Sequence, residues 1–371
     1  MFDTITAHFP DYNESPCVQE RFFEDWSKDQ TWGWQQNRAV VGHNLKIAWN
    51  LMRMASLKNK DSYLQLAERI AGLMPQVGMD KQRGGWYDVI ERVLAPGEKF
   101  HRFAWHDRKA WWQQEQGILA YLLLAGVLKM PEYLRLARES SAFYNTWFLD
   151  VDDGSVHFNV LANGQPYALG TERYKGSHSM SGYHSFELAY LAAIYTNLLI
   201  TLEPMDLYFK PKPGGFADNI LRVFPDILPA GSVKIGGVWI DGRPYENFDA
   251  AAGIVNLLPN RPEIKVQVRL LPAAIAFTAE VVEVSGGVAR LALVGDLNPA
   301  GIRFLEEALE QARDQRANAV TLELERLDKI CSEALRYIIF AKQKLGVAFK
   351  FTIKGANKEV AAAPTANSAR K

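Results

Sequence analysis

The hydrophobic pattern of the chain changes twice, and these two changes constrain its fold more than any other feature. Up to about residue 203, apolar side chains recur at helical spacing, as in Leu45, Ala48, Trp49 and Met52. Tight turns alternate with long loops rich in Gly, Trp and His. This alternation predicts helical hairpins with elaborate loops at one end, as in an α/α toroid with a site at its mouth. The expected helices cover about residues 45–55, 64–73, 111–129, 133–148 and 183–202.

The rest of the chain is expected to form two further domains and a tail. Residues 204–274 are rich in Pro and Gly and hold short β-prone runs, which predicts a small β domain. Residues 275–360 follow the order β-β-α-β-α-β, which predicts a compact α/β domain. The last stretch, 361–371, is small and polar, so we expect a disordered tail. The predicted fold class is therefore multidomain, beginning with an α/α toroid over 1–203.

Charge and cysteine usage exclude several classes of protein. Lys plus Arg (42) equal Asp plus Glu (42), so the chain has no basic field for nucleic acid or anionic lipid. The N-terminus lacks a secretory signal pattern, and the apolar run Leu188–Ile200 is too short to span a bilayer. Cys17 and Cys331 lie far apart and match no zinc or redox spacing. We therefore expect a cytoplasmic protein without structural disulfides and without a metal site.

Histidines and tryptophans concentrate in the helical part, where six of the seven histidines lie between residues 43 and 184. His43 shares a helical stripe with Lys46 and Asn50, so it faces either solvent or a polar cavity. Tryptophan faces commonly stack on sugar rings, although the same residues could instead form the core. Adjacent helical residues point about 100° apart, so of Trp111 and Trp112 we expect one in the core and one in the cavity. The candidate sugar contacts are Trp86, Trp105, Trp111 and Trp112.

Four motifs occur in a fixed order along residues 1–203. They are Gly42-His43 with Ala48-Trp49, the turn Gly84-Gly85-Trp86-Tyr87-Asp88, the run Lys109–Gln116, and Lys175 followed by Tyr183-His184 and Glu187-Leu188. In this order they resemble the N-acylglucosamine and cellobiose 2-epimerase family. The resemblance implies an (α/α)6 barrel, of which the chain holds about half. Either a second chain or an oligomer completes the barrel, or the gene sequence is truncated, or the protein works without the other half.

The same resemblance implies a reaction. Family members epimerise an open-chain sugar at C2, where a base removes a proton and an acid returns one to the opposite face of an enediolate. His43 and His184 match the two histidines of the family and are the expected catalytic groups. Gln116 and Lys175 join the tryptophans as expected substrate-binding residues. The reaction needs no cofactor.

Two positions depart from the family pattern. The family often has an acid three residues after the first histidine, where this chain has Lys46. It also has an acid at the position of Gln116. Glu115 is one step away, about 100° around the helix, so we do not expect it to take the place of that acid.

A second resemblance covers about residues 276–360. Gly295-Asp296-Leu297-Asn298 and the run Ile330–Leu335 resemble motifs of the STAS domain, the fold of anti-sigma factor antagonists. Ser332 matches the serine that kinases phosphorylate in that family. We expect Ser332 to cap a helix after a turn, and we expect a kinase or anti-sigma-like protein as partner.

These patterns predict a sugar 2-epimerase-like module that is coupled to a STAS-like regulatory domain and is incomplete by itself. The alternative is a non-catalytic signalling scaffold acting through the STAS-like domain, which the departures at Lys46 and Gln116 favour. A third interpretation is an α/α-toroid glycoside hydrolase. That reaction needs two carboxylates, for which Asp107 and Glu115 are candidates.

Overall fold

The computed structural model describes residues 1–58, 60–175, 177, 179–216, 218–273, 277–298, 301–344, 350–356 and 360. The chain forms two compact units. The first comprises Met1–Ile200, Lys212–Ser232 and Gly253–Pro262, and the second comprises Thr201–Pro211, Val233–Ala252 and Glu263–Lys371. The boundary at Ile200 lies close to the change in sequence pattern near residue 203. The predicted tail at 361–371 lies outside the described residues.

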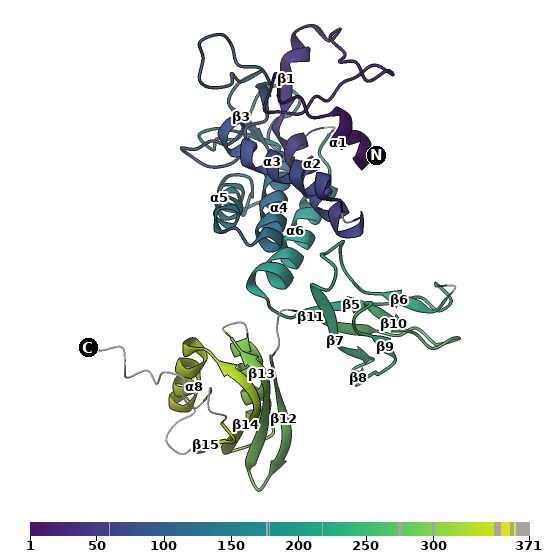
Figure 1. The fold of residues 1–371 in the computed structure, drawn as a ribbon, viewed down its shortest axis with the longest axis vertical. Helices are drawn as coiled ribbons and strands as arrows, with labels where there is room; N and C mark the ends of the chain where they lie inside the picture. Colours follow the sequence, from purple (N-terminus) through teal and green to yellow (C-terminus); the bar gives the residue numbers. More distant parts are fainter. Residues whose placement is uncertain are drawn as a thin grey trace, which may run out of the picture. The chain divides into compact units, whose positions relative to one another are not determined.

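Helical hairpins form most of the first unit (Figure 1). The helices are α1 (Phe2–His8), α2 (Val41–Lys58), α3 (Asp61–Val77), α4 (Trp111–Leu128), α5 (Pro131–Trp147) and α6 (Gly182–Tyr195). α4 is buried on all sides because it contacts α2, α5 and α6. α6 ends earlier than predicted and is followed by π-helical turns over Thr196–Thr201. Among the residues described, no helix combines the length and apolar character that crossing a membrane requires.

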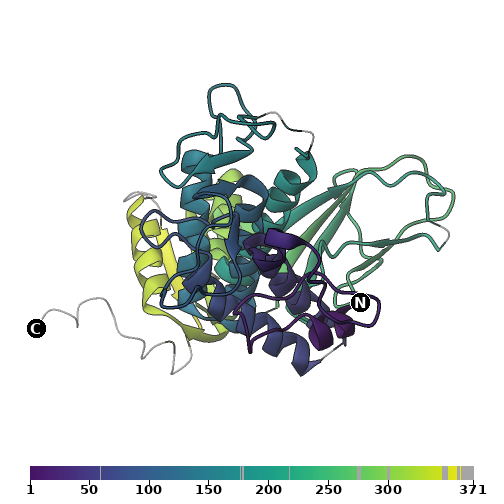
Figure 2. The ribbon, with the colours of Figure 1, turned by 90° about the horizontal axis from the view of Figure 1, so that it is seen from above.

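Short strands in the long loops fix where two of these helices begin. After the 3-10 turn Gly33–Asn37, β1 (Arg38–Val40) pairs antiparallel with β2 (Val89–Glu91). β3 (Arg108–Ala110) pairs in the same way with β4 (Asn159–Leu161). β1 runs directly into α2, and β3 runs directly into α4. The loops that carry them gather at one end of the helices (Figures 1 and 2).

The region after α6 is built from short strands, as its Pro- and Gly-rich sequence predicts. In the second unit, β5 (Met205–Phe209), β11 (Val266–Pro272), β7 (Val233–Ile240) and β8 (Arg243–Pro244) lie side by side in one antiparallel sheet. In the first unit, β6 (Ile220–Arg222) pairs with β10 (Ile254–Asn256). β9 spans Phe248–Asp249.

The last part of the second unit is an α/β arrangement. Its elements are β12 (Phe277–Ser285), β13 (Val288–Leu297), α7 (Ile302–Asp314), β14 (Ala319–Ile330), α8 (Ser332–Lys344) and β15 (Lys350–Lys354), in the order that the sequence predicts. β12 is antiparallel to β13, whereas β13, β14 and β15 are parallel. Leu291 and Leu322 of the sheet share one apolar core with Leu305 of α7 and Ile338 of α8.

The start of α8 differs from the prediction. β14 continues up to the residue before Cys331, so the turn before the helix is shorter than expected. The N–H of Ala334 donates to Sγ of Cys331 at 3.4 Å, whereas Oγ of Ser332 donates to Glu333 at 3.2 Å. The cap is therefore Cys331. The prediction that Ser332 caps the helix is wrong, because Ser332 already lies in the first turn.

Candidate functional site

The first turns of α2, α4 and α6 meet around a cavity of about 410 Å³. Strands β1 to β4 and the loops beside them form the rest of its described walls. The dipoles of three helix N-termini favour an anionic group here. The lining residues are Arg38, Val40, His43, Lys46, Asp88, Val89, Trp105, Arg108, Ala110, Trp111, Trp112, Phe158, Asn159, Glu172, Ser179, Tyr183 and His184.

His43 reaches the cavity from the first turn of α2. Gly42 lets this turn pack closely on α4, because a β-carbon at Gly42 would lie 2.6 Å from Cγ of Gln113. The N–H of Gly42 also donates to Oε1 of Gln113 at 2.6 Å. Nδ1 of His43 lies 2.8 Å from Oε2 of Glu20. A carboxylate at this distance orients the imidazole ring.

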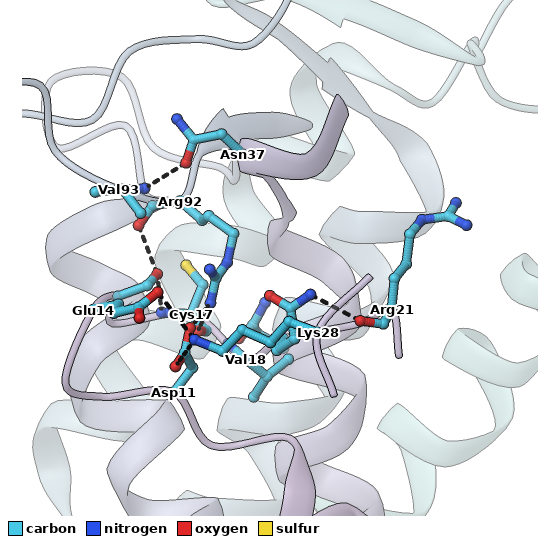
Figure 3. Close-up of polar contacts among 12 residues, drawn as sticks. Asp11, Glu14, Cys17, Val18, Arg21, Lys28, Asn37, Arg92 and Val93 are labelled. Carbon is cyan, nitrogen blue, oxygen red and sulfur yellow. Dashed lines mark hydrogen bonds and ion pairs between the residues drawn. The ribbon is translucent and has the colours of Figure 1, made fainter. Parts of the chain in front are cut away.

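The segment that carries this glutamate is anchored by a polar cluster (Figure 3). Asp11 forms ion pairs with Lys28 at 2.6 Å and with Arg92, and the side chains of Asp11 and Arg92 are buried. The N–H of Val18 donates to Oδ1 of Asn44, on α2, at 3.0 Å. The segment is thereby tied to α2 itself, which brings its carboxylate to the histidine. No spacing pattern in the sequence indicated this pairing.

His184 reaches the cavity from the first turn of α6. Its Nδ1 lies 3.5 Å from Nε2 of Gln116 and 3.8 Å from Oε2 of Glu115. Burial lowers the pKa of His184 to about 4, and the positive charge of Lys46 acts in the same direction. The imidazole is therefore neutral at neutral pH and can accept a proton.

Glu115 lies fully buried beside this histidine. Its Oε1 accepts hydrogen bonds from the hydroxyls of Tyr144 and Ser185, both at 2.9 Å. Its Oε2 has no hydrogen-bond partner among the described residues. Burial raises the pKa of Glu115 to about 7, although the two hydroxyls act against this shift. A carboxyl group that changes its charge near neutral pH therefore faces His184.

Two neighbouring residues of α4 thus approach the same imidazole. The 100° step around the helix led us to expect that Glu115 could not replace the acid of the family at position 116. That expectation stays a prediction, although α6 packs on α4 and brings the imidazole of His184 within reach of both side chains. Gln116 is held in place by Nε1 of Trp49, which donates to its Oε1 at 2.8 Å.

Trp112 contacts both histidines. Its ring centroid lies 5.3 Å from that of His43 and 5.8 Å from that of His184. Trp111 packs on Phe158 at 4.4 Å and is only 2% exposed, yet it also lines the cavity. We expected one of these adjacent tryptophans in the core and the other in the cavity, but both line it.

Arg38, Lys46 and Arg108 bring positive charge to the cavity. The guanidinium groups of Arg38 and Arg108 lie 5.3 Å and 4.2 Å from the ring centroid of Trp105, which also lines the cavity. Nζ of Lys46 donates to the hydroxyl of Tyr183 at 3.0 Å. Sequence reasoning missed the two arginines, although Arg108 stands in a run dense in polar and aromatic residues. Within the described part of the chain, no group of three or more His, Cys, Asp or Glu is placed to hold a metal ion.

Trp86, Gln116 and Lys175 lie outside the cavity lining that the described residues form. Trp86 is fully buried and stacks on Tyr121 with centroids 5.4 Å apart. Lys175 forms an ion pair with Asp150 at 2.7 Å. Trp86 and Lys175 therefore contact other parts of the protein. Gln116 lies behind the cavity wall and contacts His184, which lines the cavity.

Comparison with known proteins shows a relationship for the helical part. Residues 1–185 match the family model of N-acylglucosamine 2-epimerase. Over these residues the chain is therefore related to sugar 2-epimerases and isomerases, and the resemblance carried by the four sequence motifs is confirmed. None of the curated proteins compared with the chain matches it.

Several solved structures are also similar to the chain. A cellobiose 2-epimerase from Bacillus thermoamylovorans B4167 has 18% sequence identity and a TM-score of 0.42, and the match covers 52% of this chain and 45% of that one. A D-mannose isomerase has 21% identity and a TM-score of 0.41, with 52% and 45% covered. The chain thus spans less than half the length of these structures.

Proposed function

We propose that the cavity binds the open-chain form of a sugar and that, once the barrel is completed, His43 and His184 transfer the proton at its C2, as in a sugar 2-epimerase. The observation that supports this most is the joint placement of the two histidines. Both line one cavity, both contact the ring of Trp112, and Nδ1 of each faces a glutamate. Epimerisation requires two such groups, one for each face of C2.

In this proposal His184 is the base. Its Nδ1 lies 3.5 Å from Nε2 of Gln116 and 3.8 Å from Oε2 of Glu115, and the neutral imidazole takes the C2 proton. Burial keeps the imidazole neutral before the step. When His184 becomes an imidazolium, the carboxylate form of Glu115 stabilises the new charge, as an acid behind a catalytic histidine does in other enzymes.

The enediolate that results carries negative charge on its oxygens. Arg38 and Lys46 line the cavity. Their positive charges and the dipoles of the three helix N-termini stabilise the negative charge of the enediolate. His43, oriented by Glu20, returns a proton to the opposite face of C2.

The test is the binding of sugar alcohols, which have no carbonyl group at C1 and therefore keep that unit in the open-chain form. Mannitol or cellobiitol is added to isotope-labelled chain, and the ring C–H signals of the histidines are followed by NMR. We expect the signals of His43 and His184 to shift together while that of His8, on α1, stays. Trp112→Ala should weaken this response strongly. Unchanged signals from both cavity histidines at saturating sugar alcohol would contradict the proposal.

The α/β part of the second unit is proposed to be a STAS-like regulatory module. Besides the motif resemblance, the order of its strands and helices supports this, and Ser332 is exposed at the start of α8. The N–H of Cys331 donates to the carbonyl of Leu297 at 2.9 Å, which joins this turn to the Gly295–Asn298 motif. A phosphate on Ser332 would add a charge of about −1.5 to −2 to this surface, next to Glu333.

The regulatory role is tested with three forms of the full chain. If phosphorylation of Ser332 controls a partner, Ser332→Asp should lose a partner that both the wild type and Ser332→Ala retain in pull-downs. Identical partners for all three forms would count against this role. A partner that responds to Ser332→Asp, combined with a cavity that binds no sugar alcohol, would instead support the alternative of a non-catalytic signalling scaffold.

A further inference from the structure

The outward face of the sheet β5-β11-β7 presents polar and aromatic side chains in a regular arrangement. Along β11, Val266 and Val268 are buried, whereas Gln267 lies between them on the opposite face and is partly exposed. The strand register places Gln267 directly beside Tyr208 of β5 on one side and beside Trp239 of β7 on the other. Tyr208, Gln267 and Trp239 therefore lie side by side in one row across the three strands.

The position of the Trp239 ring depends on a glycine. A β-carbon at Gly237, two residues earlier on the same strand, would lie 2.7 Å from Cη2 of Trp239. The indole thus lies back along its own strand over Gly237, where any side chain would displace it. The guanidinium of Arg269, on the same face of β11, lies 6.0 Å from the ring centroid.

The face is hollowed around this row. A depression of about 660 Å³ is lined by Tyr208, Phe209, Lys210, Trp239, Asp241, Gly242, Lys265, Val266 and Gln267. Tyr208 is 74% exposed. Tyr208 and Trp239 stand two strands apart, about 10 Å given the usual strand spacing. A short chain of linked sugar rings is long enough to contact both.

The charges of this face are largely balanced. Lys210 pairs with Glu263 at 2.9 Å, and Arg269 pairs with Asp206 at 2.8 Å. Lys265 adds one positive charge beside the negative charge of Asp241. A face without a net basic field does not attract a phosphate backbone. Aromatic faces with amide, carboxylate and ammonium groups around them instead suit a neutral ligand that has apolar CH faces and many hydroxyls.

We infer that the outward face of β5, β11 and β7 binds a neutral oligosaccharide of pyranose units. Tyr208 and Trp239 stack on the CH faces of two sugar rings, and Gln267 and Asp241 take part in hydrogen bonds with hydroxyls. None of these residues lines the histidine cavity, so this site does not depend on the proposed epimerase function.

Isothermal titration calorimetry on the full chain tests this site. The probes are cellohexaose, β-1,4-mannohexaose and xylohexaose, with polyuridylate as a nucleic-acid comparison. We expect at least one hexasaccharide to bind, and Trp239→Ala and Tyr208→Ala each to weaken it about tenfold. Gly237→Val should also weaken binding, because it displaces the indole while leaving Trp239 in place.

Two control variants separate this site from other effects. Phe100→Ala removes a 78% exposed aromatic side chain elsewhere and should leave hexasaccharide affinity unchanged. Lys81→Met, at an exposed site of the helical unit, should also leave it unchanged. The inference is overturned if no hexasaccharide binds the wild type at millimolar concentration, or if Trp239→Ala and Tyr208→Ala bind like the wild type. Loss of polyuridylate binding in Trp239→Ala without any hexasaccharide binding would assign the face to single-stranded nucleic acid instead.

Discussion

His43 and His184 each lie beside a glutamate, but neither glutamate occupies the sequence position at which the family has its acid. Lys46 and Gln116 occupy the family positions, whereas Glu20 and Glu115 approach the two imidazoles. Glu20 precedes its histidine by 23 residues and reaches it from an anchored loop. The chain therefore keeps the pairing of histidine with carboxyl group, although local sequence comparison suggests that it is lost.

The raised pKa of Glu115 predicts a distinct pH dependence of stability. A pKa of about 7 in the folded state, against 4.5 when unfolded, means that the unfolded chain releases this proton first as pH rises. The contribution of Glu115 to stability is therefore full below pH 4.5 and is lost as pH rises through about 7. Glu115→Gln keeps the acceptor for the two hydroxyls but cannot ionise. It should remove this loss, which is at most about 3 kcal/mol.

Urea unfolding of wild type and Glu115→Gln across pH 4 to 8 measures the effect. Nine of the ten tryptophans lie between residues 26 and 147, so tryptophan fluorescence reports mainly on the helical unit. His184 acts in the opposite direction, because its lowered pKa costs stability as pH falls from 6.5 to about 4. The variant should therefore lose the fall in stability near pH 7 and keep the rise that His184 causes. If the stability of the wild type and of Glu115→Gln changed with pH in the same way, the raised pKa of Glu115 would be disproved.

Lys46 is expected to act on His184 through its charge. Burial is the larger cause of the lowered pKa of His184, and Lys46 is the second. Lys46→Met removes the charge but keeps most of the side-chain volume, so the pKa should rise while staying below 6.5. NMR titration of the His184 ring measures this shift, with Lys81→Met as a control at an exposed site. An unchanged pKa in Lys46→Met would contradict the assigned cause.

At the scale of elements, the sequence predicted the helices α2 to α8 and the longer strands, but neither α1 nor the short strands. α2 to α5 show apolar spacing over four or more turns, and β13 shows alternation, so local pattern identifies them. β1 to β4 have three residues each, too few to show a period, and form only where distant loops pair. These ladders position Arg38 and Arg108, so that part of the site could not be predicted.

The cap of α8 gives a prediction at this scale. Sulfur is a weak acceptor, whereas serine is a preferred helix cap, so Cys331→Ser should hold α8 at least as well as the wild type. Cys331→Ala should destabilise the helix by about 0.5–1 kcal/mol. Ser332→Ala should change stability by less than about 0.5 kcal/mol, because its exposed hydroxyl donates only to the neighbouring glutamate. Hydrogen exchange of the α8 amides ranks the three variants. Faster exchange in Ser332→Ala than in Cys331→Ala would contradict this ranking.

At the scale of the whole molecule, α6 carries an exposed aromatic face beside the cavity. Tyr183, Phe186 and Tyr190 are 51%, 78% and 47% exposed and lie on one side of the helix. Tyr183 also lines the cavity. Contiguous exposed aromatic surface commonly marks a site of association. The edge of the cavity therefore continues into a surface suited to another protein.

This face predicts concentration-dependent association of the purified chain. Replacing Phe186 and Tyr190 together by serine should reduce association, because it removes apolar area from the face. Sedimentation velocity over a range of concentrations measures the change. Phe100→Ser, which alters a side chain as exposed as Phe186, is the matched control and should associate like the wild type. Equal association of all three proteins would show that α6 is not the contact.

The last prediction is that this chain by itself does not exchange the C2 proton of a sugar. Because the cavity borders the exposed face of α6, a bound sugar stays in contact with water, and an enediolate needs water to be excluded. Proton NMR in deuterated water follows the C2 signals of N-acetylmannosamine, mannose and cellobiose. We expect the C2 proton to exchange no faster with the chain than in buffer alone. Mannitol should still shift the NMR signals of His43 and His184. Faster exchange that His184→Asn abolishes would show instead that the cavity is complete in this chain.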